Sequence, residues 1–174
     1  MKKKIILAFI TFLTTFISFG QAPQDVIEYN AFCLKETKPN SAVNLVLGCP
    51  KLLITKMLGS PSVINRMQWE TVAEDVDEYV YKGNSIYIDV EAKNLWGFEI
   101  KNSVYCLNYY GNHIKVGDDI KGVIKKCFPL SFRSKYMNRI IMPLSYKGEY
   151  DCTFLYFDYN SNEKITTIGI SAYS

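Results

Sequence analysis

The sequence predicts an α+β fold in which two tandem repeats, each a helix followed by antiparallel strands, form one sheet with the helices on one face. Two short amphipathic segments are each followed by strand-like runs, and the two halves match at an offset of about sixty-nine residues. Turn residues separate the runs. One compact domain is therefore expected, with an N-terminal segment (residues 21–45), repeat 1 (46–110) and repeat 2 (111–174).

The first twenty residues have the pattern of a cleavable export signal. Three lysines precede an apolar run, Ile5–Phe19, and the small residues Ser18 and Gly20 occupy the −3 and −1 positions of a cleavage site. Cleavage there would make Gln21 the first residue of the mature chain. Because a bilayer requires roughly 20 apolar residues to cross, we expect no stable membrane anchor after cleavage and a periplasmic or secreted location.

The charge of the mature chain argues against a nucleic-acid partner. Of the 20 basic residues, three lie in the export signal, which leaves 17 to balance 17 acidic residues. The net charge of +3 thus comes from the segment that is removed. A basic surface is the usual electrostatic mark of nucleic-acid binding, and the mature chain lacks that excess.

Five cysteines follow the export signal, in a compartment where disulfides persist. They are Cys33, Cys49, Cys106, Cys127 and Cys152. Their spacing contains no CxxC or Cys/His pattern and His113 is the one histidine, so we expect no metal site and no cofactor. Buried thiols and one or two disulfides both remain possible, and the sequence does not determine the pairing.

Two short amphipathic helices are expected, one opened by Leu47-Gly48-Cys49-Pro50 and running through Leu58, the other opened by Val116-Gly117-Asp118-Asp119 and running through Phe128. Pro50 and Asp119 are each expected at the first helical position, where proline loses no hydrogen bond and a carboxylate meets the positive end of the helix dipole. Each helix ends shortly before a proline.

The strands of each half follow its helix. In the first half Gly83-Asn84 is expected to turn a hairpin between Tyr79–Tyr81 and Ile86–Ile88. In the second half the expected strands are Arg139–Leu144 and Cys152–Tyr159, around Lys147-Gly148, and Ile165–Ile170. Tyr87 and Tyr156 are sixty-nine residues apart and typify the match between the halves.

Period-two alternation assigns the strand residues to two faces. The apolar set expected to face the helices is Val80, Ile86, Ile88, Phe98, Ile100, Leu155, Phe157, Ile168 and Ile170. The aromatic set expected on the opposite face, as a protein-binding site, is Tyr79, Tyr81, Tyr87, Phe154 and Tyr156. The alternative is that these rings pair across strands and stabilise the sheet without binding anything.

Short motifs give the chain a family resemblance. They are the Leu/Val-Gly opening of each helix, its ending in Leu-Gly-x-Pro or Phe-Pro, and a Phe-Asp-x-Asn hairpin followed by Lys-Ile. Over about residues 46–170 the chain resembles the tandem repeats of the β-lactamase inhibitor protein-like fold, and it is similar to the single unit of the SmpA/OmlA outer-membrane assembly family. The resemblance implies a concave sheet that grips a partner protein with aromatic residues. The lipid-anchoring cysteine of the assembly factors has no counterpart here.

Enzyme motifs are missing from the chain: there is no Gly-x-Ser-x-Gly elbow, His-Glu-x-x-His or phosphate-binding glycine loop. A Cys–His nucleophile would require His113 beside a cysteine, which the sequence does not show. Carboxylates for glycoside chemistry could come from the acidic run Glu74, Asp75, Asp77 and Glu78, whose ordinary explanation is a solvated loop. A calcium-like string, Asp158, Asn160, Asn162 and Glu163, has a glutamate where the loop needs glycine, so we interpret it as a β-turn.

The sequence therefore favours an exported, non-enzymatic protein-binding or inhibitor-like module that uses an aromatic sheet face. Immunity to a toxin is one specific form of this function, and the expected partner is another extracytoplasmic protein. The alternatives are a structural component of cell-envelope assembly and a Cys/His or carboxylate hydrolase.

Overall fold

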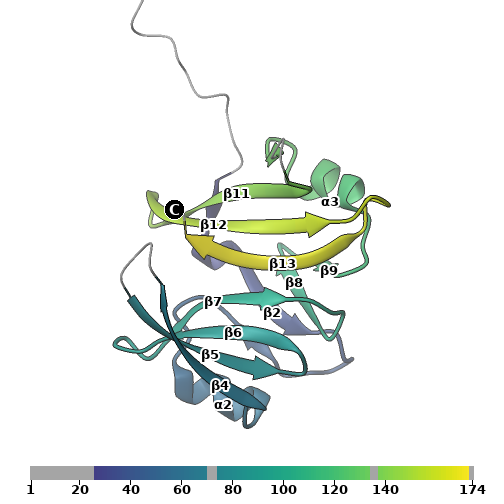
Figure 1. Ribbon diagram of the computed structural model, residues 1–174. Coiled ribbons are helices and arrows are strands. Elements are labelled where there is room, and N and C mark those ends of the chain that lie inside the picture. Colours follow the sequence, from purple (N-terminus) through teal and green to yellow (C-terminus); the bar gives the residue numbers. More distant parts are fainter. Residues whose placement is uncertain (1–25, 70–73, 134–136, 173–174) are drawn as a thin grey trace, which may run out of the picture.

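The computed structural model describes residues 26–69, 74–133 and 137–172. The expected export signal and its cleavage site lie outside these residues. Figure 1 shows the described chain as one large, twisted sheet with further elements behind it.

The predicted α+β class is wrong, because the protein is mostly β. The described residues contain thirteen strands and two α-helices, α2 (Lys51–Leu58) and α3 (Ile120–Cys127), together with a short 3-10 helix, η1 (Tyr29–Ala31). Each α-helix has eight residues, too few to form a layer of its own beside so many strands. There is also a second sheet, so one sheet of two helix-plus-strand repeats does not describe the molecule.

The large sheet has nine strands and is mixed. Its path runs β1-β11-β12-β13-β7-β6-β5-β4, with β10 also paired to β11, and β1 is parallel to β11. The strands are β1 (Ile27–Glu28), β4 (Val63–Trp69), β5 (Glu74–Tyr81), β6 (Asn84–Asp89), β7 (Leu95–Ile100), β10 (Phe132–Arg133), β11 (Arg139–Tyr146), β12 (Glu149–Tyr159) and β13 (Ile165–Ala172).

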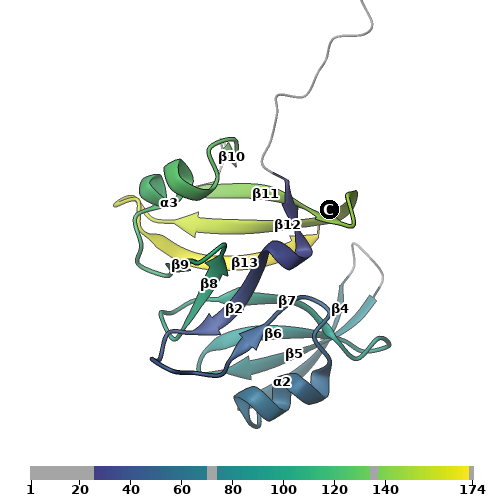
Figure 2. The same cartoon turned by 180° about the vertical axis from the view of Figure 1, so that it is seen from behind.

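A four-stranded sheet, which the sequence did not predict, covers the middle of the large one (Figure 2). It comprises β3 (Asn44–Leu45), β2 (Phe32–Glu36), β8 (Tyr105–Tyr109) and β9 (Asn112–Lys115), in that order. The segment before the first helix and the segment between the two halves thus pair with each other. Leu34 pairs with Leu107 across β2 and β8, and both side chains are fully buried.

The hydrophobic core lies between the large sheet and the elements behind it. Ile54 of α2, Ile120 of α3 and Leu34 of the small sheet join the same buried cluster as Ile86 and Phe157 of the large sheet. The helices and the small sheet therefore cover one face of the large sheet. We call the opposite face, which carries none of these elements, the open face (Figures 1 and 2).

Both helices begin one residue later than predicted. Pro50 and Asp119 are N-cap residues rather than first helical residues, and the Asp119 carboxylate accepts a hydrogen bond of 2.9 Å from the Gly122 amide. Since an N-cap side chain of this kind satisfies an otherwise unpaired amide, Asp119 stabilises the start of α3. Pro50 makes no such side-chain bond.

Backbone hydrogen bonds tie each helix start to the turn of a hairpin. The Lys51 amide donates to the Lys93 carbonyl at 2.9 Å, and the Ile120 amide donates to the Glu163 carbonyl at 2.9 Å. Lys93 and Glu163 both have positive φ, 54° and 58°, in the turns before β7 and β13. Each helix is therefore positioned by a strained turn of the sheet that it packs on.

The first hairpin turns at Lys82-Gly83, one residue before the predicted Gly83-Asn84. Both turn residues have positive φ, 51° and 77°, and Tyr81 pairs directly with Asn84. Two residues of positive φ are what a type I′ turn requires. The shift places Asn84 inside the sheet instead of in the turn.

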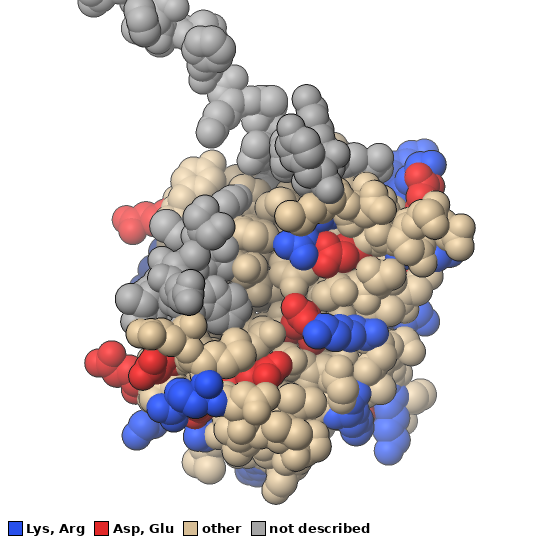
Figure 3. All heavy atoms as spheres, viewed as in Figure 1, with Lys and Arg blue, Asp and Glu red and all other residues tan. Residues whose placement is uncertain are grey.

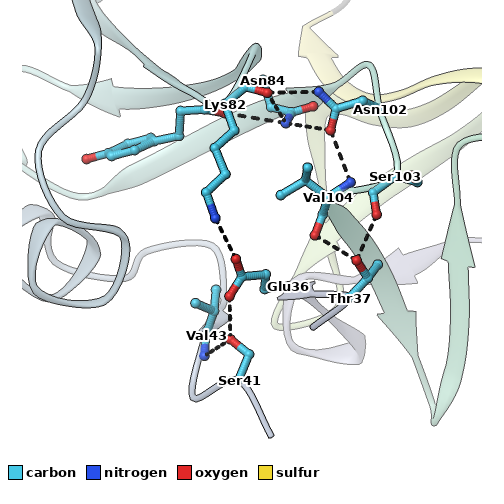
Figure 4. Close-up of polar contacts among 10 residues, drawn as sticks. Glu36, Thr37, Ser41, Val43, Lys82, Asn84, Asn102, Ser103 and Val104 are labelled. Atoms are coloured by element: carbon cyan, nitrogen blue, oxygen red, sulfur yellow. Dashed lines mark hydrogen bonds and ion pairs between the residues drawn. The ribbon is translucent and has the colours of Figure 1, made fainter. Parts of the chain in front are cut away.

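Asn84 is completely buried and links the hairpin to the loop before β8 (Figure 4). Its Nδ2 donates to Asn102 Oδ1 at 3.0 Å and lies 3.3 Å from the Lys82 carbonyl, while its Oδ1 accepts from the Lys101 amide at 2.9 Å. In the same region Lys82 Nζ contacts Glu36 Oε1 of β2 at 2.7 Å. These bonds attach the small sheet to the large one.

Replacing Asn84 by alanine is expected to cost about 3 kcal/mol of unfolding free energy, because a fully buried side chain would lose its bonds to Asn102 and to the Lys101 amide. The matched control is Asn112→Ala. Asn112 also follows a glycine in a hairpin, but it is only half-buried and its side chain makes one bond, to the Tyr109 carbonyl at 3.1 Å. That loss should cost about 1 kcal/mol. Chemical denaturation of both variants checks the difference, and equal costs would contradict the role given to Asn84.

Candidate functional site

The structure separates the five aromatic residues predicted to form one face. Tyr79 and Tyr81 lie on the covered face, each 4% exposed, and both belong to the hydrophobic core. Tyr79 pairs directly with Ile86, so the two side chains share a face. Val80, predicted to face the helices, pairs with Ser85 on the open face. The face assignment of these three β5 residues is therefore wrong.

The other three predicted residues, Tyr87, Phe154 and Tyr156, do lie on the open face. They are 8%, 8% and 5% exposed, so all three are buried, but none belongs to the hydrophobic cluster behind the sheet. The Phe154 and Tyr156 rings are 6.2 Å apart, centroid to centroid, and tilted. They form part of a packed surface layer rather than a set of protruding anchors.

Tyr156 is the centre of this layer. Its hydroxyl donates to Glu99 Oε2 at 2.9 Å, and the Arg139 guanidinium lies 4.1 Å from its ring centroid. Arg139 in turn forms two bonds with Asp158, at 2.6 and 2.9 Å. Burial, reinforced by the charge of Glu99, raises the pKa of the Tyr156 hydroxyl, which therefore remains a hydrogen-bond donor.

A glycine makes room for the Tyr156 ring. Gly169 pairs with Tyr156 across β12 and β13, and a Cβ built on Gly169 would lie 2.5 Å from the Cζ and Oη atoms of the ring. No side chain larger than hydrogen fits there unless the ring moves. Gly169 also pairs with Glu99 of β7, so the ring crosses β13 to reach the Glu99 carboxylate.

Further polar pairs continue across the open face towards β4. Glu99 contacts Lys101 Nζ at 2.5 Å. Glu78 accepts hydrogen bonds from Ser85 at 2.6 Å and from Asn65 at 2.8 Å. Acidic and basic atoms accordingly lie side by side across this view of the molecule (Figure 3). Glu99 and Asp158 thus have cationic partners within the protein, and Glu78 has neutral hydrogen-bond donors.

The surroundings shift the pKa values of two groups on the open face, the Tyr87 hydroxyl and the Glu78 carboxyl. Burial, with the charges of Glu99 and Glu78, raises the pKa of Tyr87 to about 12. Hydrogen bonds from Ser85 and Asn65 lower the pKa of Glu78. Both groups are consequently held in a single protonation state at neutral pH.

A pocket of about 740 Å³ lies beside β7, where the two halves of the sheet meet the N-terminal segment. Tyr29 of η1, Trp96 of β7 and Tyr146 of β11 line it. Sequence reasoning missed these three rings, because they come from segments far apart in the chain and share no motif. They are brought together only by the pairing of β1 with β11 and of β7 with β13.

Of the residues considered for cysteine chemistry, Cys33, Cys106 and His113 lie on the small sheet, whereas Cys49 precedes α2 and Cys127 ends α3. Cys33 pairs with Asn108, which pairs with His113 on the next strand, and Asn108 Nδ2 lies 3.5 Å from the Cys33 sulfur. No bond between His113 and a cysteine occurs among the described residues. Cys33, Cys49, Cys106 and Cys127 are free thiols, and burial raises the pKa of the last three, which lowers the thiolate fraction of each.

The acidic run is part of β5 and its described members have different partners. Asp77 binds Arg66 at 2.5 Å, and Glu78 is held by Ser85 and Asn65 as described above. Since neighbouring strand residues point to opposite faces, Asp77 and Glu78 do not form a facing carboxylate pair. The predicted solvated loop is wrong, because this segment is a strand.

The calcium-like string forms a turn, as predicted. Asn160 Oδ1 accepts from the amides of Asn162 and Lys164 at 3.0 and 3.1 Å, and Asp158 is bound to Arg139. Within the described ranges, no group of three or more His, Cys, Asp or Glu residues could hold a metal ion. No helix found there has the length and apolarity to cross a membrane.

Comparison with family models, with curated proteins and with solved structures gave no match. The resemblance to the inhibitor-like and outer-membrane assembly families therefore stays a prediction from short motifs.

Replacing Gly169 by alanine is expected to displace the Tyr156 ring and to cost about 2 kcal/mol of unfolding free energy. Gly97→Ala is the matched control on the neighbouring strand, since a Cβ there meets Ile170 and Tyr87 at ordinary distances of 3.6 and 3.7 Å. It should cost less than about 1 kcal/mol. Denaturation curves together with near-UV circular dichroism check both effects, and equal stability of the two variants would contradict the packing described here.

Acid is expected to weaken the Glu78 contacts. Its folded-state pKa is lowered from 4.5, so its contribution to stability is present above pH 4.5 and is lost as the pH falls through the folded-state pKa. Glu78→Gln should therefore make the stability less dependent on pH below 4.5. Unfolding measured from neutral to acidic pH tests this, with Glu91→Gln, an exposed turn glutamate, as the control. A slope that is the same in wild type and Glu78→Gln would argue against it.

Proposed function

We propose that the protein is an exported, non-enzymatic binding module that holds another protein against the open face of its large sheet. The partner is extracytoplasmic, in accordance with the export signal expected at residues 1–20. Inhibition of the partner is one form of this function, as the family resemblance implies. Cell-envelope assembly would be a second form if the partner is an outer-membrane protein.

One observation carries the proposal: the open face is broad and its polar side chains are fixed before any partner binds. Tyr156, Glu99 and Arg139 are held by one another and by Asp158 and Lys101. Side chains that are already ordered lose little conformational entropy on association. Tyrosine and arginine are also enriched in protein interfaces.

The shape of the site favours a protein over a small molecule. Small ligands bind in concave sites that enclose most of their surface, whereas the open face extends across neighbouring strands from β11 to β4. A face of that breadth suits the area that a stable protein–protein interface requires. At its β4 end Val63, 47% exposed, and Asn65 remain accessible to a partner.

The test uses exposed residues of the open face, because the buried tyrosines cannot be replaced without unfolding the layer. Immobilised protein (residues 21–174) is used to capture partners from periplasmic and culture-medium extracts, and the captured protein is then purified for affinity measurements. Val63→Asp and Lys101→Glu should each weaken its binding at least about tenfold, equivalent to 1.4 kcal/mol.

Leu52→Asp is the matched control, because Leu52 is 81% exposed on α2, behind the sheet. It should bind like the wild type. Loss of binding in Leu52→Asp, with Val63→Asp and Lys101→Glu unaffected, would move the interface to the helical side. Failure of the wild type to retain any protein would overturn the proposed function.

A further inference from the structure

The pocket beside β7 has the composition of a ligand site that is separate from the open face. We propose that it binds a neutral saccharide chain, stacked on the rings of Tyr29, Trp96 and Tyr146. Its volume of about 740 Å³ lies within the range of roughly 300–1,000 Å³ that is usual for ligand pockets. The proposal does not depend on the protein-binding function of the open face.

The aromatic residues define the apolar part of the site. Tyr29 and Tyr146 lie next to each other, with ring centroids 5.8 Å apart and a tilt of 48° between them. Trp96 lines the pocket from β7. Aromatic rings offer broad apolar surfaces with a polar group at one end. The C–H faces of a pyranose ring match such surfaces, and its hydroxyl groups at the rim remain available for hydrogen bonds.

Amide side chains supply the polar part. Asn30 and Asn94 line the pocket, and neither side chain has a hydrogen-bond partner among the described residues. Each amide offers a carbonyl acceptor and two N–H donors. That combination suits hydroxyl groups, which both donate and accept.

The charges of the site argue against an ionic ligand. Glu28 and Lys147 are the one acidic and the one basic residue of the lining, so the pocket has no net charge. Glu28 Oε1 already accepts bonds from the Ser145 hydroxyl and the Gly148 amide, both at 2.9 Å. The Lys147 ammonium lies 5.0 Å from the centroid of the Tyr146 ring. One acidic and one basic residue form no cluster of like charge that would attract an anion or a cation.

The walls of the pocket are held in place by bonds outside it. Besides the Glu28 contacts, the Tyr29 hydroxyl lies 3.0 Å from Thr153 Oγ1 of β12. On the opposite wall, the Gly48 amide donates to the Leu95 carbonyl at 2.8 Å. The site is therefore preorganised, which reduces the entropy lost when a ligand binds.

The test titrates the full mature chain with cellohexaose, maltohexaose and N-acetylchitohexaose up to about 1 mM, the range of weak complexes. The chain has two tryptophans, so a Trp69→Phe background leaves Trp96 as the fluorescent reporter. At least one of the three sugars should change the Trp96 emission and bind with a measurable Kd. Tyr146→Ala should raise that Kd at least tenfold, whereas Tyr146→Phe should keep it within about threefold.

Tyr146 is 55% exposed at a hairpin end, so its replacement should leave the fold intact, which circular dichroism verifies. Tyr110→Ala, at a tyrosine that is 75% exposed in another hairpin, is the matched control and should bind like the Trp69→Phe background. Absence of binding by all three sugars would overturn the proposal. Equal binding by Tyr146→Ala, or a response only to a charged chain such as hexagalacturonate, would overturn it as well.

Discussion

The pairing of β13 with β7 is the constraint on which the rest of the structure depends. Only through these two strands do the β11–β13 and β4–β7 parts of the large sheet become continuous, with Ile168 opposite Ile100 and Gly169 opposite Glu99. The first pair extends the hydrophobic core across the junction, because both isoleucines are fully buried. The second pair leaves a strip without a side chain, through which Tyr156 reaches Glu99. The absence of a Cβ at Gly169 thus allows the hydrogen bond between Tyr156 and Glu99 on the open face.

The same junction positions the pocket. Trp96 and Asn94 belong to the β7 side, whereas Tyr146 and Lys147 come from the β11–β12 hairpin, and the N-terminal segment closes the gap between them. Glu28 fixes this closure by accepting bonds from Ser145 and Gly148. The pairing of β13 with β7 therefore shapes both the open face and the pocket, although the two differ in their chemistry.

Local sequence patterns predicted the helices and hairpins well, but they did not predict the fold class. The two helices lie within the predicted ranges, and the positive-φ pair Lys147-Gly148 joins two strands where a hairpin was expected. The small sheet was missed because Phe32–Glu36 pairs with Tyr105–Tyr109, and no local pattern encodes a pairing across such a distance. Tyr79 was assigned to the wrong face of the sheet, although the hairpin turn in the sequence indicates the correct one. A two-residue turn at Lys82-Gly83 places Tyr79 opposite Ile86, and direct partners share a face whatever their polarity.

The open face and the pocket differ in how far their polar groups already have partners within the protein. On the open face every described carboxylate of the Tyr156 network already has a cationic or hydroxyl partner, so the proposed partner protein would gain little from new ion pairs and would rely on shape and on displaced water. In the pocket the two asparagine amides lack partners, so a ligand gains hydrogen bonds that the protein does not make for itself. For the proposed protein partner, affinity on the open face would therefore come from preorganisation over a wide area. For the proposed saccharide, specificity in the pocket would come from a few polar groups between aromatic walls.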